Sequence, residues 1–142
     1  MNQQDFENAF IAKLSGIVEY KNKNEIWWED NEHKVTIEFL NDSASFTKVR
    51  TYYDNGNIQW EKNYQNDKQH GEYIEWYENG NKNLEENYQN DKLYGKSISW
   101  FKDGNKQWER NYQNSKLHGK CIRWSNNGNK EYEVDFKNGI KV

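Results

Sequence analysis

The stretch Trp76-Tyr77-Glu78-Asn79-Gly80-Asn81 decides the fold, because versions of it recur at a fixed spacing. A second marker, Tyr64-Gln65-Asn66-Asp67-Lys68, returns in close copies at residues 88–92 and 112–116. The repeated glycines of the first marker lie 24 positions apart, and so do those of a third marker. They are Gly56, Gly80, Gly104 and Gly128, and Gly71, Gly95 and Gly119. Such a period is typical of an array of supersecondary units that are each too small to bury a core alone.

Each unit reads as two β-strands and two turns. Ile74 and Trp76 alternate with Glu75, which is the period of a strand. Asn79-Gly80 and its copies are strong hairpin signals, and the longer turn at 65–71 ends at a glycine for which we expect a positive φ or a close backbone approach. No helical period is present in the repeats. The sequence therefore predicts an all-β fold, an elongated antiparallel meander of stacked 24-residue β-hairpin repeats with a short N-terminal helix.

The strand register follows if the turn centres are placed at residues 68 and 80. Trp60 then faces Trp76, and Trp76 faces Leu84. This register predicts one cross-strand row of large side chains on a single face, which is Tyr52, Trp60, Trp76, Leu84, Trp100, Trp108, Trp124 and Tyr132. On the opposite face it predicts the row Glu61, Glu75, Glu85, Ser99, Glu109, Arg123 and Glu133. The large side chains are either the core of a one-layer sheet or an exposed recognition surface.

The first fifty residues differ from the repeats. Phe6, Phe10 and Leu14 recur at helical spacing, and Ser15-Gly16 is a C-terminal stop signal. We therefore expect a helix over 1–15, degenerate capping repeats over 16–51, and hairpin repeats over 52–142. Terminal repeats are commonly atypical because they cap the stack.

Composition narrows the class of protein. The mean hydropathy of −1.40 is one usually found in disordered chains, but aromatic residues make up 16% of the sequence and supply enough apolar surface for a folded core. The net charge of −3 is spread over mixed Lys and Glu without a basic arm, which argues against nucleic acid as the partner. The start of the chain has no signal-peptide pattern, and no segment is apolar enough to span a bilayer. We expect a cytoplasmic location.

No catalytic, cofactor-binding or metal-binding residues are expected. A single cysteine, Cys121, excludes an internal disulfide framework and cysteine-based metal sites. His33, His70 and His118 do not have metal-ligand spacing, and Tyr94 takes the equivalent position in the intervening copy. A repeat supplies the same residue many times, whereas an active site needs different residues once. These points argue against an enzyme.

The combined pattern resembles the MORN-repeat variant family. The pattern is Tyr/Trp-x-x-Asn-Gly-Asn, then Glu-x-x-Tyr-x-Asn-x-Lys, then x-x-Gly-x-x-x-x-Trp, and it covers 52–142 well and 16–51 weakly. That family includes the antitoxin component of a bacterial toxin–antitoxin module, and similar repeats occur in proteins of large DNA viruses. The resemblance implies an elongated sheet of stacked hairpins that acts as a protein-binding or membrane-associated scaffold.

The residues of interest fall into two groups. The first group, expected to shape the repeats, comprises the seven glycines named above together with Trp60, Trp76, Trp100, Trp108 and Trp124. The second group, candidates for binding a protein partner that carries basic charge, comprises Glu61, Glu75, Glu85, Glu109, Glu133, Tyr64, Tyr88 and Tyr112. A glutamate row can steer a basic partner electrostatically. The alternatives for the glutamates are salt bridges to Lys or Arg within the hairpins, or the copying of an ancestral unit.

Two further binding hypotheses stay open. Lysines form two columns, Lys68, Lys92 and Lys116 at one edge and Lys82, Lys106 and Lys130 near the other. Such columns can contact anionic lipid headgroups, as a peripheral membrane protein would, or keep sheets from pairing edge to edge. Trp-rich hairpins can also stack on glycans.

Overall fold

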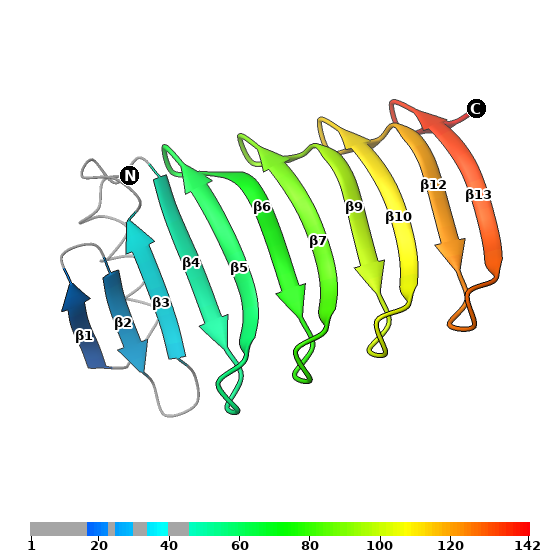
Figure 1. The fold of residues 1–142 in the computed structure, drawn as a ribbon. Helices are drawn as coiled ribbons and strands as arrows, with labels where there is room; N and C mark the ends of the chain where they lie inside the picture. The colour runs from blue at the N-terminus through cyan, green and yellow to red at the C-terminus, as the bar shows by residue number, and fades with distance from the viewer. Residues whose placement is uncertain (1–16, 23–24, 30–33, 40–45) are drawn as a thin grey trace.

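The computed structural model describes residues 17–22, 25–29, 34–39 and 46–142, which form one open antiparallel sheet (Figure 1). The strands follow one another across the sheet in chain order. Within the described residues no helix is present, and the helix expected over 1–15 lies outside them. The predicted all-β meander of stacked hairpins is confirmed.

The main strands are β1 (Ile17–Asn22), β2 (Glu25–Glu29), β3 (Lys34–Phe39), β4 (Phe46–Tyr52), β5 (Ile58–Gln65), β6 (Lys68–Trp76), β7 (Lys82–Gln89), β9 (Gly95–Trp100), β10 (Lys106–Gln113), β12 (Gly119–Trp124) and β13 (Lys130–Lys137). Three two-residue strands lie beside them, β8 (Lys92–Leu93), β11 (Lys116–Leu117) and β14 (Ile140–Lys141). β1, β2 and β3 continue the same sheet, and their role as a cap stays a prediction.

Two kinds of turn join successive strands, and each kind lies along one of the two edges of the sheet at which the strands end. At one edge Gly80 has φ +90°, and its N–H donates to the carbonyl oxygen of Tyr77 at 2.9 Å. At the other edge Asn66 and Asp67 both have positive φ, +49° and +67°, and form the two-residue turn between β5 and β6. Positive φ at both central residues defines the tight hairpin turn that Asn and Asp favour. The turn expected over 65–71 is therefore shorter, and Gly71 (φ +96°) lies inside β6.

The predicted register is wrong by one residue. Trp60 pairs with Glu75 instead of Trp76, and Glu75 pairs with Leu84 on its other side. The cause is a pair of irregularities, because register shifts occur between Lys62 and Tyr64 and again between Glu75 and Trp76. Each bulge inserts extra residues into one strand and moves all pairs beyond it. A one-residue slip transfers side chains to the other face, so the single row of large side chains does not exist.

The register instead distributes the large apolar side chains over both faces. Trp60, Leu84, Trp108 and Tyr132 lie on one face, with Ser99 between Leu84 and Trp108. The other face carries a row in which glutamate and isoleucine alternate, which is Glu61, Ile74, Glu85, Ile98, Glu109, Ile122 and Glu133. Trp76, Trp100 and Trp124 lie beside the isoleucines on that face.

Full burial is restricted to a few described side chains. Ile37 on β3 and Val49 on β4 are completely buried and directly paired. Ile74 and Cys121 are the other buried apolar residues of the described chain. Nearly all side chains of the repeats are half-buried or exposed, as expected of a sheet that has no second layer among the described residues.

Candidate functional site

One face of the sheet, the Glu–Ile face, holds the glutamate–isoleucine row and the tryptophans beside it. Glu61, Glu85, Glu109 and Glu133 were all candidates for binding a basic partner, and all four are already paired with cations. Glu61 lies 2.6 Å from Arg50 Nε, and Glu85 lies 2.6 Å from Lys82 Nζ. These contacts match the alternative hypothesis of salt bridges within the hairpins.

The pairs at the C-terminal end follow the same plan. The Glu109 carboxylate lies between Lys106 Nζ at 3.0 Å and Lys96 Nζ at 3.2 Å. Glu133 likewise contacts Lys130 and, at 3.2 Å, Lys120. Hydrogen bonds from the lysines lower the pKa of both carboxyl groups. Each of these four carboxylates on the Glu–Ile face thus has at least one cationic partner within the described hairpins.

The opposite face, the Tyr face, carries the other predicted site residues. In the register of the described strands, its side chains come from five sets of equivalent repeat positions. These sets are Trp60, Leu84, Trp108 and Tyr132; Glu75, Ser99 and Arg123; Lys62, Glu86 and Arg110; Tyr73, Ser97 and Cys121; and Tyr64, Tyr88 and Tyr112. Glu75 is therefore separated from the other candidate glutamates and joins the tyrosines. Glu86 was not among the site residues predicted from the sequence.

Glu75 and Glu86 accept hydrogen bonds from neutral groups alone. The Tyr73 hydroxyl donates to Glu75, and Asn83 Nδ2 donates to the same carboxylate at 3.3 Å. Glu86 accepts from the Tyr88 hydroxyl and from Ser97 Oγ, each at 3.1 Å. Neither carboxylate makes an ion pair with any residue that the structure describes.

The surroundings of Tyr73 and Tyr88 raise the pKa of both hydroxyl groups. Their rings meet edge to face with centroids 6.3 Å apart. Burial and the neighbouring Glu86 carboxylate raise the pKa of Tyr88 to about 12. Burial and the hydrogen bond to Glu75 raise the pKa of Tyr73 as well. Both hydroxyls therefore stay protonated and hold the carboxylates in place.

Cations on the Tyr face lie over aromatic rings. Lys62 Nζ is 4.8 Å from the ring centroid of Trp60 and 5.4 Å from that of Tyr73. Arg110 lies 4.2 Å above the ring of Trp108. Cation–π contacts of this length are attractive. They also occupy ring faces on which a glycan would otherwise stack.

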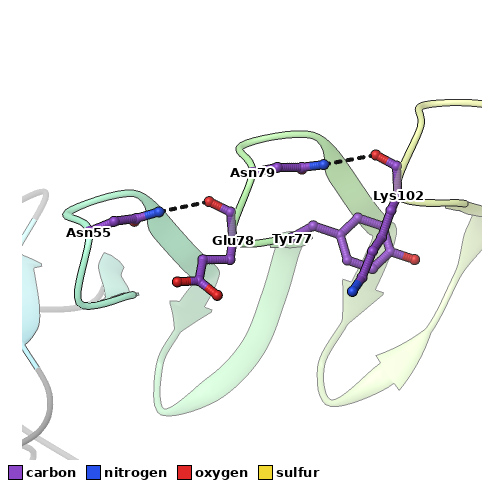
Figure 2. Close-up of a pocket in the computed structure, with 5 residues that line it drawn as sticks. All are labelled: Asn55, Tyr77, Glu78, Asn79 and Lys102. Atoms are coloured by element: carbon purple, nitrogen blue, oxygen red, sulfur yellow. Dashed lines mark hydrogen bonds between the residues drawn. The ribbon is translucent and has the colours of Figure 1, made fainter.

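The Gly-turn edge holds a ladder of contacts between successive repeats (Figure 2). Asn55 Nδ2 and Asn57 Nδ2 each donate to the carbonyl oxygen of Glu78 at 2.9 Å. In the next repeat Asn79 and Asn81 donate in the same way to Lys102 at 3.0 and 2.8 Å. The hollow in Figure 2 is therefore lined by residues of a structural hydrogen-bond network. This explains the repeated Asn-Gly-Asn, whose inter-repeat contacts were not predicted from the sequence.

The described part of the chain offers few features of a catalytic or metal site. It contains no group of three His, Cys, Asp or Glu side chains that could hold a metal ion. Cys121 is a buried free thiol. A helix long and apolar enough to cross a membrane is likewise missing from the described residues.

Fold and faces together define an array of β-hairpin repeats whose described residues form a single sheet with two chemically different faces. A family model described as MORN repeat variant matches the chain at residues 48–66, 69–90 and 117–138. Each match covers one hairpin around a Gly turn, β4–β5, β6–β7 and β12–β13. The chain therefore carries MORN-variant repeats, which are generally motifs of protein or membrane interaction. No curated protein matches the chain.

Proposed function

We propose that this chain is a non-catalytic repeat scaffold that binds a protein partner on its open sheet. The observation that supports the proposal is a sheet whose repeats keep large aromatic side chains half-exposed, with no second layer among the described residues (Figure 1). Aromatic side chains with polar tips are enriched where proteins bind proteins. Repeat arrays commonly present such extended surfaces.

The specific form that the family resemblance suggests is an antitoxin, whose partner would be a toxic protein encoded beside it. Expression of the neighbouring open reading frame alone should then stop bacterial growth, and co-expression with this chain should restore it. The two purified proteins should form a complex of fixed stoichiometry in size-exclusion chromatography with light scattering. A neighbour that is harmless and fails to bind would refute the antitoxin form and leave the scaffold function to other partners.

A peripheral membrane protein is the second candidate, and one observation favours it. Lys68, Lys92 and Lys116 make no ion pair with any described residue, so their charges are available. The other lysine column is used internally, because Lys82 and Lys106 bind Glu85 and Glu109. Anionic headgroups attract exposed lysines at roughly 1 kcal/mol each.

Co-sedimentation with vesicles separates the two functions. Phosphatidylcholine vesicles with and without phosphatidylserine are mixed with the full chain at low and high salt. The scaffold proposal predicts that the chain stays in the supernatant in every mixture. Salt-sensitive pelleting with phosphatidylserine, lost in a Lys68→Ala/Lys92→Ala/Lys116→Ala variant, would support the membrane function instead.

A further inference from the structure

We propose that the Tyr face docks its protein partner through an arginine side chain that lies against Glu75 and Glu86. The inference rests on the protein-binding function proposed above and adds the face and the chemistry of the contact. Three independent features of the described strands carry it.

The first feature is that the centre of the Tyr face changes from repeat to repeat, whereas the glutamate–isoleucine row and the tryptophans of the opposite face do not. Glu61, Ile74 and Trp76 reappear unchanged in the following copies that hold their positions on the Glu–Ile face. On the Tyr face, position 75 changes to Ser99 and then Arg123. Positions that stay constant serve the stacking that every unit needs. Positions that vary on one face make each part of that face chemically distinct, as the recognition of one partner requires.

The second feature is the state of the two carboxylates. Glu75 and Glu86 come from adjacent strands, β6 and β7, and neither has a cationic partner among the described residues. Neutral donors, above all Tyr73 and Tyr88, fix their orientation. A half-buried carboxylate of this kind gains most from a charge-assisted hydrogen bond. The four candidate glutamates of the Glu–Ile face, in contrast, already have cationic partners.

The third feature is that two other repeats carry a cation at the position equivalent to Glu86 on this face. Lys62 and Arg110 hold equivalent positions in their repeats, and each lies over the tryptophan two residues before it. In the repeat between them that position is Glu86, and the tryptophan is replaced by Leu84. The middle of the row therefore has a carboxylate where the units on either side have a cation. A partner cation would restore the alternation of charge.

Arginine fits this place better than lysine. Its planar guanidinium can bind carboxylates with two parallel hydrogen bonds and can stack on a ring, here that of Tyr73 or Tyr88. Lys62 and Arg110 each lie two strands from Glu86, or about 10 Å at the usual strand spacing. They repel further positive charge, so the surface favours one arginine flanked by neutral or acidic residues.

The test uses the full ¹⁵N-labelled chain and two short peptides, acetylated and amidated Gly-Ser-Arg-Ser-Gly and the same peptide with citrulline in place of arginine. Citrulline keeps the shape of arginine and lacks its charge. Amide shifts in the protein are followed during each titration. The variants are Glu75→Gln/Glu86→Gln on the Tyr face and Glu85→Gln/Glu109→Gln on the Glu–Ile face, which change the net charge equally.

We expect saturable shifts around Tyr73, Glu75, Glu86 and Ser97 with the arginine peptide and none with the citrulline peptide. The Tyr-face variant should bind the arginine peptide at least fivefold more weakly, and the Glu–Ile-face variant within twofold of wild type. Equal losses in both variants would show general charge attraction and overturn the proposal, as would shifts centred elsewhere or no saturable shift. If a protein partner binds the Tyr-face variant as tightly as wild type, this inference fails and the scaffold function stands.

Discussion

The side chain of Asn57 donates a hydrogen bond to the backbone carbonyl oxygen of Glu78 at 2.9 Å, and so joins one Gly turn to the next. Asn81 and Asn105 make the same contact to Lys102 and Asn126. Asn129 comes after the last of these contacts, and its side chain has no acceptor among the described residues. The ladder links neighbouring repeats through side chains as well as through the strands.

Replacing a ladder asparagine should therefore destabilise the array. Asn81→Ala should lower the free energy of unfolding by about 0.5–1.5 kcal/mol, the usual net contribution of one hydrogen bond. Asn129→Ala is the matched control, and its loss should be smaller. Urea unfolding followed by circular dichroism measures both. Equal losses at the two positions would mean that the inter-repeat hydrogen bond adds nothing.

The Gly turns depend on backbone conformation. Gly80 has φ +90°, and an added Cβ would meet only Asn57 Nδ2 at 3.7 Å, so any cost comes from strain. Gly80→Val should lose roughly 1–3 kcal/mol of stability. Gly80→Asn should lose less, since asparagine tolerates positive φ and does so at Asn66. A Gly80→Val protein with the denaturation midpoint of wild type would contradict this account of the turn.

Stability should scale with the number of whole units. Deleting residues 57–80 removes one period and joins Gly56 to Asn81, so every remaining repeat keeps an equivalent neighbour. The product should be folded and less stable than wild type. Deleting residues 57–68 removes half a period, breaks strand alternation and should unfold the repeats. Far-ultraviolet circular dichroism and thermal melting compare the two, and equally folded spectra would refute the repeat-by-repeat account.

The Tyr face should be visible in an alkaline titration. An ordinary tyrosine titrates near pH 10, whereas the pKa of Tyr88 is raised to about 12. Because the folded state holds this proton more tightly, its contribution to stability is complete below pH 10 and is lost as pH rises towards 12. Absorbance near 295 nm should show a late-titrating component that shrinks in Tyr88→Phe. Loss of a component that titrates near pH 10, with the late component unchanged, would instead place Tyr88 in ordinary solvent.

The fold was predictable from the sequence because turn residues and period are local signals. Gly80 and its copies locate one set of turns, and the family resemblance points to the same hairpins. The register was not predictable in the same way, since no residue type in the sequence marks where a bulge adds residues to a strand. Two signals could have corrected it. Asn66-Asp67 fits a two-residue turn centred before residue 68. Lys82 and Glu85 lie three positions apart, and a bulge between them lets them pair on one face.

The candidate site was predictable only in part for the same reason. A slip of one residue placed Glu75 among the other candidate glutamates and left Glu86 unnoticed. Tyr88, in contrast, was a candidate from sequence, because its repeat position does not depend on the register. Its contact with Glu86 needs only the two-residue spacing within β7. The identity of the partner could not be predicted, because this chain carries only the surface that the partner contacts and not the partner's own residues.

The most direct test of the account is the affinity of a purified protein partner for the two charge-matched variants. Isothermal titration calorimetry compares Glu75→Gln/Glu86→Gln with Glu85→Gln/Glu109→Gln, after circular dichroism has shown both to be folded. The account predicts at least about tenfold weaker binding for the first variant, equivalent to roughly 1.4 kcal/mol, and binding within about twofold of wild type for the second. Unchanged binding by the first variant with a loss in the second would contradict the assignment of recognition to the Tyr face.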